Sequence, residues 1–172
     1  VYRRSHKHTR AQGMVEFALA ISTFLVLVLG IIEFGWLLAV YTSVYSASRE
    51  AARYGAAVGL SGNGVSYDQD CAGMRAAAVR VGQIGQVDAT DVEIRYQGAL
   101  NNASAFNTLP ACPNPTQLGD KVMVRVIGTY QPLVPLIPIP TINLTITTSR
   151  TIIKDVDIMG TPRPFLPPTP HG

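Results

Sequence analysis

The stretch from Gln12 to Gly59 contains no proline, begins strongly apolar, and then becomes small and amphipathic. Since nothing in it interrupts a helix, it predicts one continuous helix about 70 Å long, at about 1.5 Å per residue. The hydrocarbon core of a bilayer takes only about 20 helical residues, or about 30 Å. One half of the helix therefore fits within a membrane, while the other half extends beyond it.

The first half of this helix is the apolar one. No charged residue lies between Glu16 and Glu33, and the flank before it is basic, with Arg3, Arg4, His6, Lys7, His8 and Arg10. A basic flank beside an apolar span predicts that residues 1–11 lie in the cytoplasm and that the chain after the helix lies outside. A cleaved secretory signal is the alternative. The apolar run is longer than the usual stretch of about 7–15 residues, and no clear A-x-A site follows it.

The second half carries a small residue at every fourth position. This small-residue ridge consists of Ala39, Ser43, Ala47, Ala51, Gly55 and Gly59. Residues four apart share one side of a helix, and small side chains allow another backbone to approach closely. Glycine inside a helix costs about 1 kcal/mol relative to alanine, which favours a packing role for the two glycines. The ridge fits either the chain's own domain or a neighbouring subunit. We expect the outer end to meet the chain's own sheet and the lower end, at Ala39 and Ser43, to meet a neighbour.

Two glutamates lie within or beside the apolar run. A charged side chain at the centre of a bilayer costs about 2.5–3.5 kcal/mol on insertion scales. Glu16 lies at the cytoplasmic edge, where the basic flank lowers that cost. Glu33 is predicted to face a partner or a cavity, and the alternative is that it marks the outer headgroup boundary.

Three segments of this part of the chain resemble a known family. They are R-A-Q-G-M-V-E-F-A-L at 10–19, G-I-I-E-F-G at 30–35 and R-E-A-A-R-Y-G-A at 49–56. With the basic leader and the aliphatic run, they are similar to the TadE-like pseudopilins of tight-adherence (Tad/Flp) pilus systems, relatives of type IV pilins. The resemblance implies export by a pilus-type machine and incorporation in a homo-oligomeric filament. It also implies two partners, a prepilin peptidase and an ATPase-driven assembly platform.

The resemblance also implies roles for single residues. Glu16 matches the motif glutamate of pilin-like helices, and in a filament its carboxylate would need a cationic partner within an apolar core. The expected partner is at a neighbour's amino-terminal end, either the freed amine or Arg10. Processing depends on Ala11, Gln12, Gly13 and Met14. If the glutamate lies five residues after the cut, the cut falls between Ala11 and Gln12. A cut between Gly13 and Met14 instead leaves Glu16 at the third position of the processed chain. Retention of the leader is the third possibility.

Residues 60–159 predict one small outer domain. Asp68 or Asp70 is a candidate N-cap for a helix over Cys71–Gly82. Alternating apolar side chains predict strands over 91–97, 121–130 and 142–147, the last with an extension toward 153. We expect an α+β fold in which the long helix and the short second helix pack on an antiparallel sheet of three or four strands.

Two proline-containing segments fall outside these elements. Residues 131–140, Q-P-L-V-P-L-I-P-I-P, cannot form a helix or a central strand. This link is either a strap over the domain's own core or a contact surface for a neighbouring subunit. Residues 160–172 form a proline-rich tail, which alone would be an extended arm.

The chain has two cysteines, Cys71 and Cys112, and both follow the apolar helix. Disulfides persist in compartments outside the cytoplasm. We therefore predict a bridge between them, closing a loop of about 42 residues and stabilising the domain by about 4 kcal/mol. Two free thiols are the alternative.

Catalytic and ligand-binding chemistry is not indicated. The histidines His6, His8 and His171 all lie in terminal arms, so the outer domain has no serine–histidine–acid arrangement. No phosphate-binding loop or zinc-ligand spacing occurs, and we expect neither a metal nor another cofactor. The net charge of +3 comes with basic residues concentrated at the amino terminus, which membrane topology explains without a nucleic-acid partner.

The sequence therefore predicts a structural subunit of an extracellular filament, assembled through its amino-terminal helix after a stage in the cytoplasmic membrane. The alternative is a minor pseudopilin or an envelope assembly module that stays in that membrane. An anchored enzyme is a third and weaker hypothesis.

Overall fold

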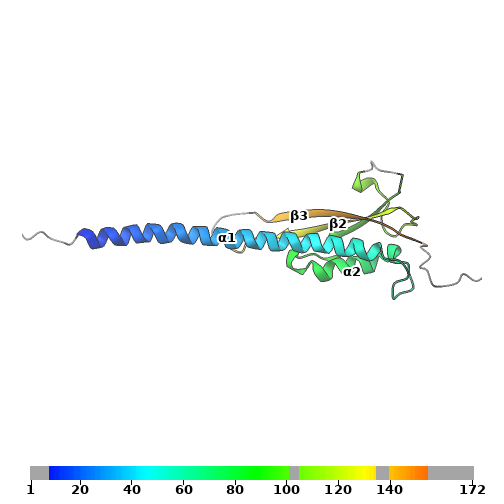
Figure 1. Ribbon diagram of the computed structural model, residues 1–172, viewed down its shortest axis with the longest axis horizontal. Coiled ribbons are helices and arrows are strands. Elements are labelled where there is room, and N and C mark those ends of the chain that lie inside the picture. Colours follow the sequence, from blue (N-terminus) through cyan, green and yellow to red (C-terminus); the bar gives the residue numbers. More distant parts are fainter. Residues whose placement is uncertain (1–7, 101–104, 135–139, 155–172) are drawn as a thin grey trace, which may run out of the picture.

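The fold was analysed in a computed structural model, which describes residues 8–100, 105–134 and 140–154, with side chains from Gln12 onward. A single long helix, α1 (His8–Gly55), runs through the molecule. Its outer half carries a second helix on one side and a sheet on the other, while its amino-terminal half projects from the folded domain (Figure 1). The fold class is α+β, as predicted. The proline-rich tail and residues 135–139 of the proline link lie outside the described residues.

Helix α1 has about the predicted length but is shifted toward the amino terminus. It ends at Gly55, four residues before the expected end. Gly59 lies in the turn that follows, with φ of 109°, a backbone conformation that glycine adopts without the steric cost of a side chain. Gly59 therefore allows the chain to turn away from the helix, and the small-residue ridge ends at Gly55.

Helix α2 (Cys71–Val81) begins at the predicted cap. The carboxylate of Asp70 accepts a hydrogen bond of 2.9 Å from the backbone N–H of Gly73. This bond, together with one from Tyr54, holds the pKa of Asp70 below its ordinary value. The helix packs across α1 with Met74 and its neighbours Ala77 and Ala78 buried.

The three strands are β1 (Val92–Gln97), β2 (Lys121–Tyr130) and β3 (Ile142–Thr151). They form an antiparallel sheet in the order β1-β2-β3, with Ile94 opposite Val124 and Val124 opposite Thr148. Within the described ranges the sheet therefore has three strands. The predicted alternation holds, because every second residue of β1 and β2 is buried, including Val92, Ile94, Val122 and Val124.

Short 3-10 turns connect these elements: η1 (Tyr67–Gln69), η2 (Gln83–Gly85), η3 (Ala89–Asp91) and η4 (Phe106–Thr108). The core lies between α1, α2 and the sheet. Val44 of α1 is fully buried, and it sits against two glycines, Gly85 in η2 and Gly128 in β2. A Cβ on either glycine would overlap the Val44 side chain, so the two glycines let the sheet and the η2 turn approach the helix closely.

Candidate membrane and assembly surface

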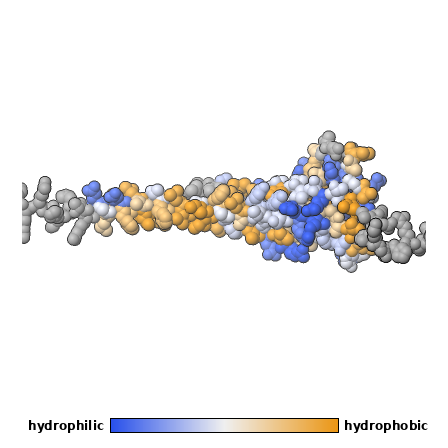
Figure 2. All heavy atoms as spheres, in the orientation of Figure 1, coloured by the Kyte–Doolittle hydropathy of each residue, from blue (hydrophilic) through white to orange (hydrophobic). Residues whose placement is uncertain are grey.

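The amino-terminal half of α1 carries a continuous apolar surface that the folded domain does not cover (Figure 2). All side chains from Gln12 to Leu27 are exposed, including Phe17 with 68% of its surface accessible. The stretch from Gln12 to Ile32 spans about 30 Å, which equals the hydrocarbon core of a bilayer. By length and composition this helix can cross a membrane once.

Glu33 lies where the free half of α1 ends, and its carboxylate is bound to the chain's own domain. It accepts a hydrogen bond from the hydroxyl of Tyr130, the last residue of β2. It also accepts hydrogen bonds from the backbone N–H groups of Leu133 at 3.1 Å and Val134 at 3.2 Å. The carboxylate therefore has its partners within the same chain, at the start of the proline link.

Trp36 strengthens this attachment from the next turn of α1. Its indole N–H donates to the carbonyl oxygen of Gln131 at 3.1 Å. The residues 131–134 are thus held at two adjacent turns of the helix, just above the free apolar half. The sequence did not indicate these partners, since neither tyrosine nor tryptophan forms a recognisable motif with Glu33.

Glu16 has a different environment from Glu33. It is exposed on the free half of α1, and within the part of the chain described here no residue forms a hydrogen bond or ion pair with it. The role in assembly expected for Glu16 stays a prediction. Among the residues considered for processing, Gln12, Gly13 and Met14 are also exposed on this half.

The small-residue ridge packs mainly within the subunit. Ser43 is buried and donates a hydrogen bond of 3.2 Å to the carbonyl of Val81, at the end of α2. Ala47 and Ala51 are completely buried, and a Cβ at Gly55 would overlap the Met74 sulfur. The expectation that Ser43 is free to meet a neighbour is wrong, because its surface is already occupied.

Of the ridge residues that lie within α1, Ala39 alone is partly accessible to solvent. Gly59 is outside the helix, and a Cβ there would meet no atom within 4 Å. Its positive φ accounts for the glycine, and the expected packing on the chain's own sheet is not found at this residue among the described residues.

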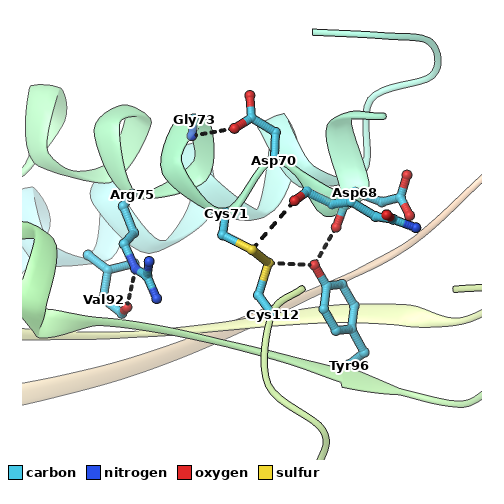
Figure 3. Close-up of a disulfide and its surroundings, with 9 residues drawn as sticks. Asp68, Asp70, Cys71, Gly73, Arg75, Val92, Tyr96 and Cys112 are labelled. Carbon is cyan, nitrogen blue, oxygen red and sulfur yellow. Dashed lines mark hydrogen bonds between the residues drawn. A yellow bond between two sulfur atoms is a disulfide. The ribbon is translucent and has the colours of Figure 1, made fainter. Parts of the chain in front are cut away.

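The predicted disulfide is present between Cys71 and Cys112, with Cα atoms 5.9 Å apart (Figure 3). It joins the first residue of α2 to the loop between β1 and β2. The hydroxyl of Tyr96 points toward it and lies 3.0 Å from the Cys112 sulfur. The same hydroxyl donates to the backbone carbonyl of Asp68. The disulfide and β1 are therefore tied to the turn that precedes α2.

Asp68 forms a buried ion pair beneath this region. Its side chain is 3% exposed, and its carboxylate lies 2.8 Å from the ammonium group of Lys154. The hydroxyls of Ser66 and Thr116 donate to the same carboxylate. Burial alone would raise the pKa of Asp68, but the hydrogen bonds from Lys154, Ser66 and Thr116 together hold that pKa below its ordinary value.

This ion pair predicts a loss of stability in acid. A carboxylate whose pKa is lower in the folded state contributes stability above its unfolded pKa of about 3.9, and the contribution is lost as the pH falls through the folded pKa. The free energy of unfolding of the wild type should therefore fall below about pH 4. Asp68→Asn lacks this pH-dependent contribution. The difference in the free energy of unfolding between the wild type and Asp68→Asn should therefore narrow as the pH falls. Denaturant titrations between pH 7 and pH 2, followed by Trp36 fluorescence, measure it. An unchanged difference over that range would contradict the prediction.

The comparison with protein families agrees with the sequence-based resemblance. Residues 11–53 match the family model described as TadE-like protein, which covers the free half of α1 and most of its packed half. The resemblance is thereby confirmed over this segment. Neither the curated proteins nor the solved structures contain a significant match to the chain.

Proposed function

We propose that this chain is a structural, pilin-like subunit of a Tad-type extracellular filament. The observation that carries the proposal is the free half of α1, which is predominantly apolar, exposed, and as long as a bilayer is thick. A helix that is apolar all round needs either lipid or other helices as its surroundings. The family match over residues 11–53 supports the same role.

The proposal has two stages. The chain is first inserted in the cytoplasmic membrane, with residues 1–11 inside and the disulfide-bonded domain outside. The helix then leaves the lipid and packs with the helices of other copies. A prepilin peptidase and an ATPase-driven platform are the partners for export. Processing of the leader falls at Ala11–Gln12 or at Gly13–Met14, and the mass of the surface chain decides between these sites and retention.

Electron microscopy of sheared cell-surface material, labelled with an antibody to the outer domain, tests the proposal. Label along the length of fibres supports a filament subunit. Label confined to fibre ends, or recovery of the chain only with the cytoplasmic membrane, would instead support a minor pseudopilin or a membrane-bound assembly module. A deletion strain supplies the control for antibody specificity.

The topology gives a separate prediction. Reporter enzymes fused after Gly160 should be active only when the reporter works outside the cytoplasm, since the basic flank retains residues 1–11 inside. Fusions after Arg10 should show the reverse pattern. Cytoplasmic activity of the fusion after Gly160 would overturn the proposed orientation.

Glu16 gives a prediction for assembly. In a helical bundle its carboxylate would be surrounded by apolar side chains, where a charge has to be paired. Glu16→Gln should leave the chain inserted and its outer domain folded, while the yield of sheared fibres drops about tenfold or more, as expected for loss of a close charge pair. Immunoblots of membrane and sheared fractions measure both quantities. Wild-type fibre yield from this variant would refute the role assigned to Glu16.

A further inference from the structure

A groove runs between the outer half of α1 and the edge strand β3. Its lower part, which is the end nearer the free half of α1, is a shallow cavity of about 310 Å³. This part is lined by Ser46, Arg49, Glu50, Arg53 and Arg150. Its upper part, of about 670 Å³, shares two of these arginines and continues past residues 148–151 to Ala56, Ala57 and Ile153. This α1–β3 groove is therefore basic at its lower end and lined partly by small and apolar side chains at its upper end.

The lower end of the groove has more positive than negative charge. Glu50 lies 2.9 Å from Arg53 and 3.5 Å from Arg80, so its carboxylate is shared between two cations. The guanidinium of Arg49 lies over the Tyr45 ring, 5.5 Å from its centroid, and has no carboxylate partner among the described residues. Arg150 on β3 is exposed and likewise has none within those residues. The cavity also contains Glu50, but neither Arg49 nor Arg150 has a carboxylate partner within the described ranges. Both guanidinium groups can therefore donate charge-assisted hydrogen bonds to an added carboxylate.

Glu16 is the acidic side chain that fits this cavity. Within the described ranges, the other carboxylates accept hydrogen bonds or ion pairs inside the chain: Glu33, Glu50, Asp68, Asp70, Asp88, Asp91, Glu93 and Asp120. Glu16 has no such partner and lies on a helix that nothing in the subunit covers. Ala20 and Phe24 follow at intervals of four residues and share its side of the helix.

We propose that the α1–β3 groove receives the free half of α1 from a second copy of this chain, with Glu16 of that copy placed between Arg49 and Arg150. The proposal rests on the filament function proposed above and names the surface that holds successive subunits together. It gives Glu16 a partner on the neighbour's outer domain, whereas the family resemblance points to the neighbour's amino-terminal end.

The spacing of residues along the two helices supports this pairing. Copies inserted in one membrane in the same orientation have parallel helices. If Glu16 lies level with Arg49, then Ala20 lies level with Arg53, and Phe24 reaches the small and apolar end of the groove at Ala57. The stagger is 33 residues, or about 50 Å at about 1.5 Å per residue. An amphipathic groove that takes a helix by such regularly spaced anchors is a common mode of recognition.

A charge exchange tests the pairing in cells that carry the assembly machinery. Arg49→Glu and Glu16→Arg should each lower fibre yield about tenfold or more, and the two substitutions together should restore most of it. Ala76→Glu is the control, since Ala76 is exposed on α2 and does not line the groove, and it should leave the yield within about twofold of the wild type. Thermal melting of each protein in detergent excludes loss of folding. Failure of the double variant to recover, with both single variants folded, would overturn the pairing.

Cysteine crosslinking tests the stagger directly. In oxidised fibres the variant with Phe24→Cys and Ala57→Cys should give a ladder of linked chains, because each subunit contacts one copy above and one below. The control variant with Phe24→Cys and Ala76→Cys should stay monomeric on the same gel, since Ala76 is exposed on α2. Peptide mapping verifies that Cys71 and Cys112 remain joined to each other.

These outcomes separate the inference from the function on which it rests. Absence of labelled fibres in the wild type would refute the filament function itself. Wild-type fibres without a ladder in the test variant, and without recovery by charge exchange, would refute only the α1–β3 groove as the receiving surface. A loss of fibres in Arg49→Glu that Glu16→Arg does not reverse would refute Glu16 as the group that meets Arg49.

Discussion

Removal of the Cys71–Cys112 disulfide should lower the free energy of unfolding of the outer domain by about 4 kcal/mol. The two cysteines are 41 residues apart, and the bridge restricts the unfolded chain by closing that loop. The double variant Cys71→Ala, Cys112→Ala tests this by denaturant unfolding in detergent. The total free energy of unfolding of a small domain is only about 5–15 kcal/mol, so the loss would remove a large fraction of it.

Reduction provides the control for the disulfide. A reducing agent should lower the stability of the wild type by a similar amount and leave the double variant unchanged. Cells that make the double variant should also yield less chain at the surface, because the destabilised domain is exposed to proteolysis. Equal stability of wild type and double variant, or a double variant that still responds to reduction, would contradict the prediction.

The sequence predicts the local elements well because they depend on local patterns. Alternation of apolar residues identified β2 with its observed bounds, Lys121–Tyr130. Asp70 was one of two candidate caps, and its hydrogen bond to Gly73 identifies it as the cap. Such features need only neighbouring residues, and a period of two or a cap at a helix start is visible in the printed sequence.

The partners across the fold were less predictable, because they depend on long-range packing. Glu33 could have faced a subunit, a cavity or the headgroups, and only the fold brings Tyr130 and the backbone of residues 133–134 to it. For the same reason, the sequence did not determine which surface the small-residue ridge packs on. The contacts of Gly85 and Gly128 with Val44 could not be predicted from the sequence, since neither glycine belongs to a periodic pattern.

The α1–β3 groove illustrates a third kind of limit. Its lining residues come from positions about one hundred residues apart, and Arg49, Arg53 and Arg150 gave no motif in the sequence. The family resemblance identified Glu16 as a residue of interest, but the surface that it meets depends on the fold of the outer domain. A residue of interest within one helix can thus be predicted from a local motif, whereas a groove lined by two distant segments is visible only in the structure.

Overpacking the ridge at its outer end should also destabilise the domain. Gly55→Leu places a side chain where Met74 is already completely buried, and the free energy of unfolding should fall by about 1–3 kcal/mol. Gly59→Leu should cost a similar amount for a different reason, since it forces a branched side chain into positive φ with open space around it. Thermal and denaturant unfolding of both variants measure the losses.

The Met74→Ala background separates the two causes. Truncation of Met74 vacates the space that Leu at position 55 would fill, so Gly55→Leu should become much less costly there, with a coupling of about 0.5–3 kcal/mol. Gly59→Leu should cost the same in both backgrounds, because strain in the turn does not depend on the helix contact. If Met74→Ala failed to relieve Gly55→Leu, close contact between α1 and α2 would not be the reason for glycine at the end of the ridge. Relief at Gly59 instead would show that the turn, too, is packed against the core.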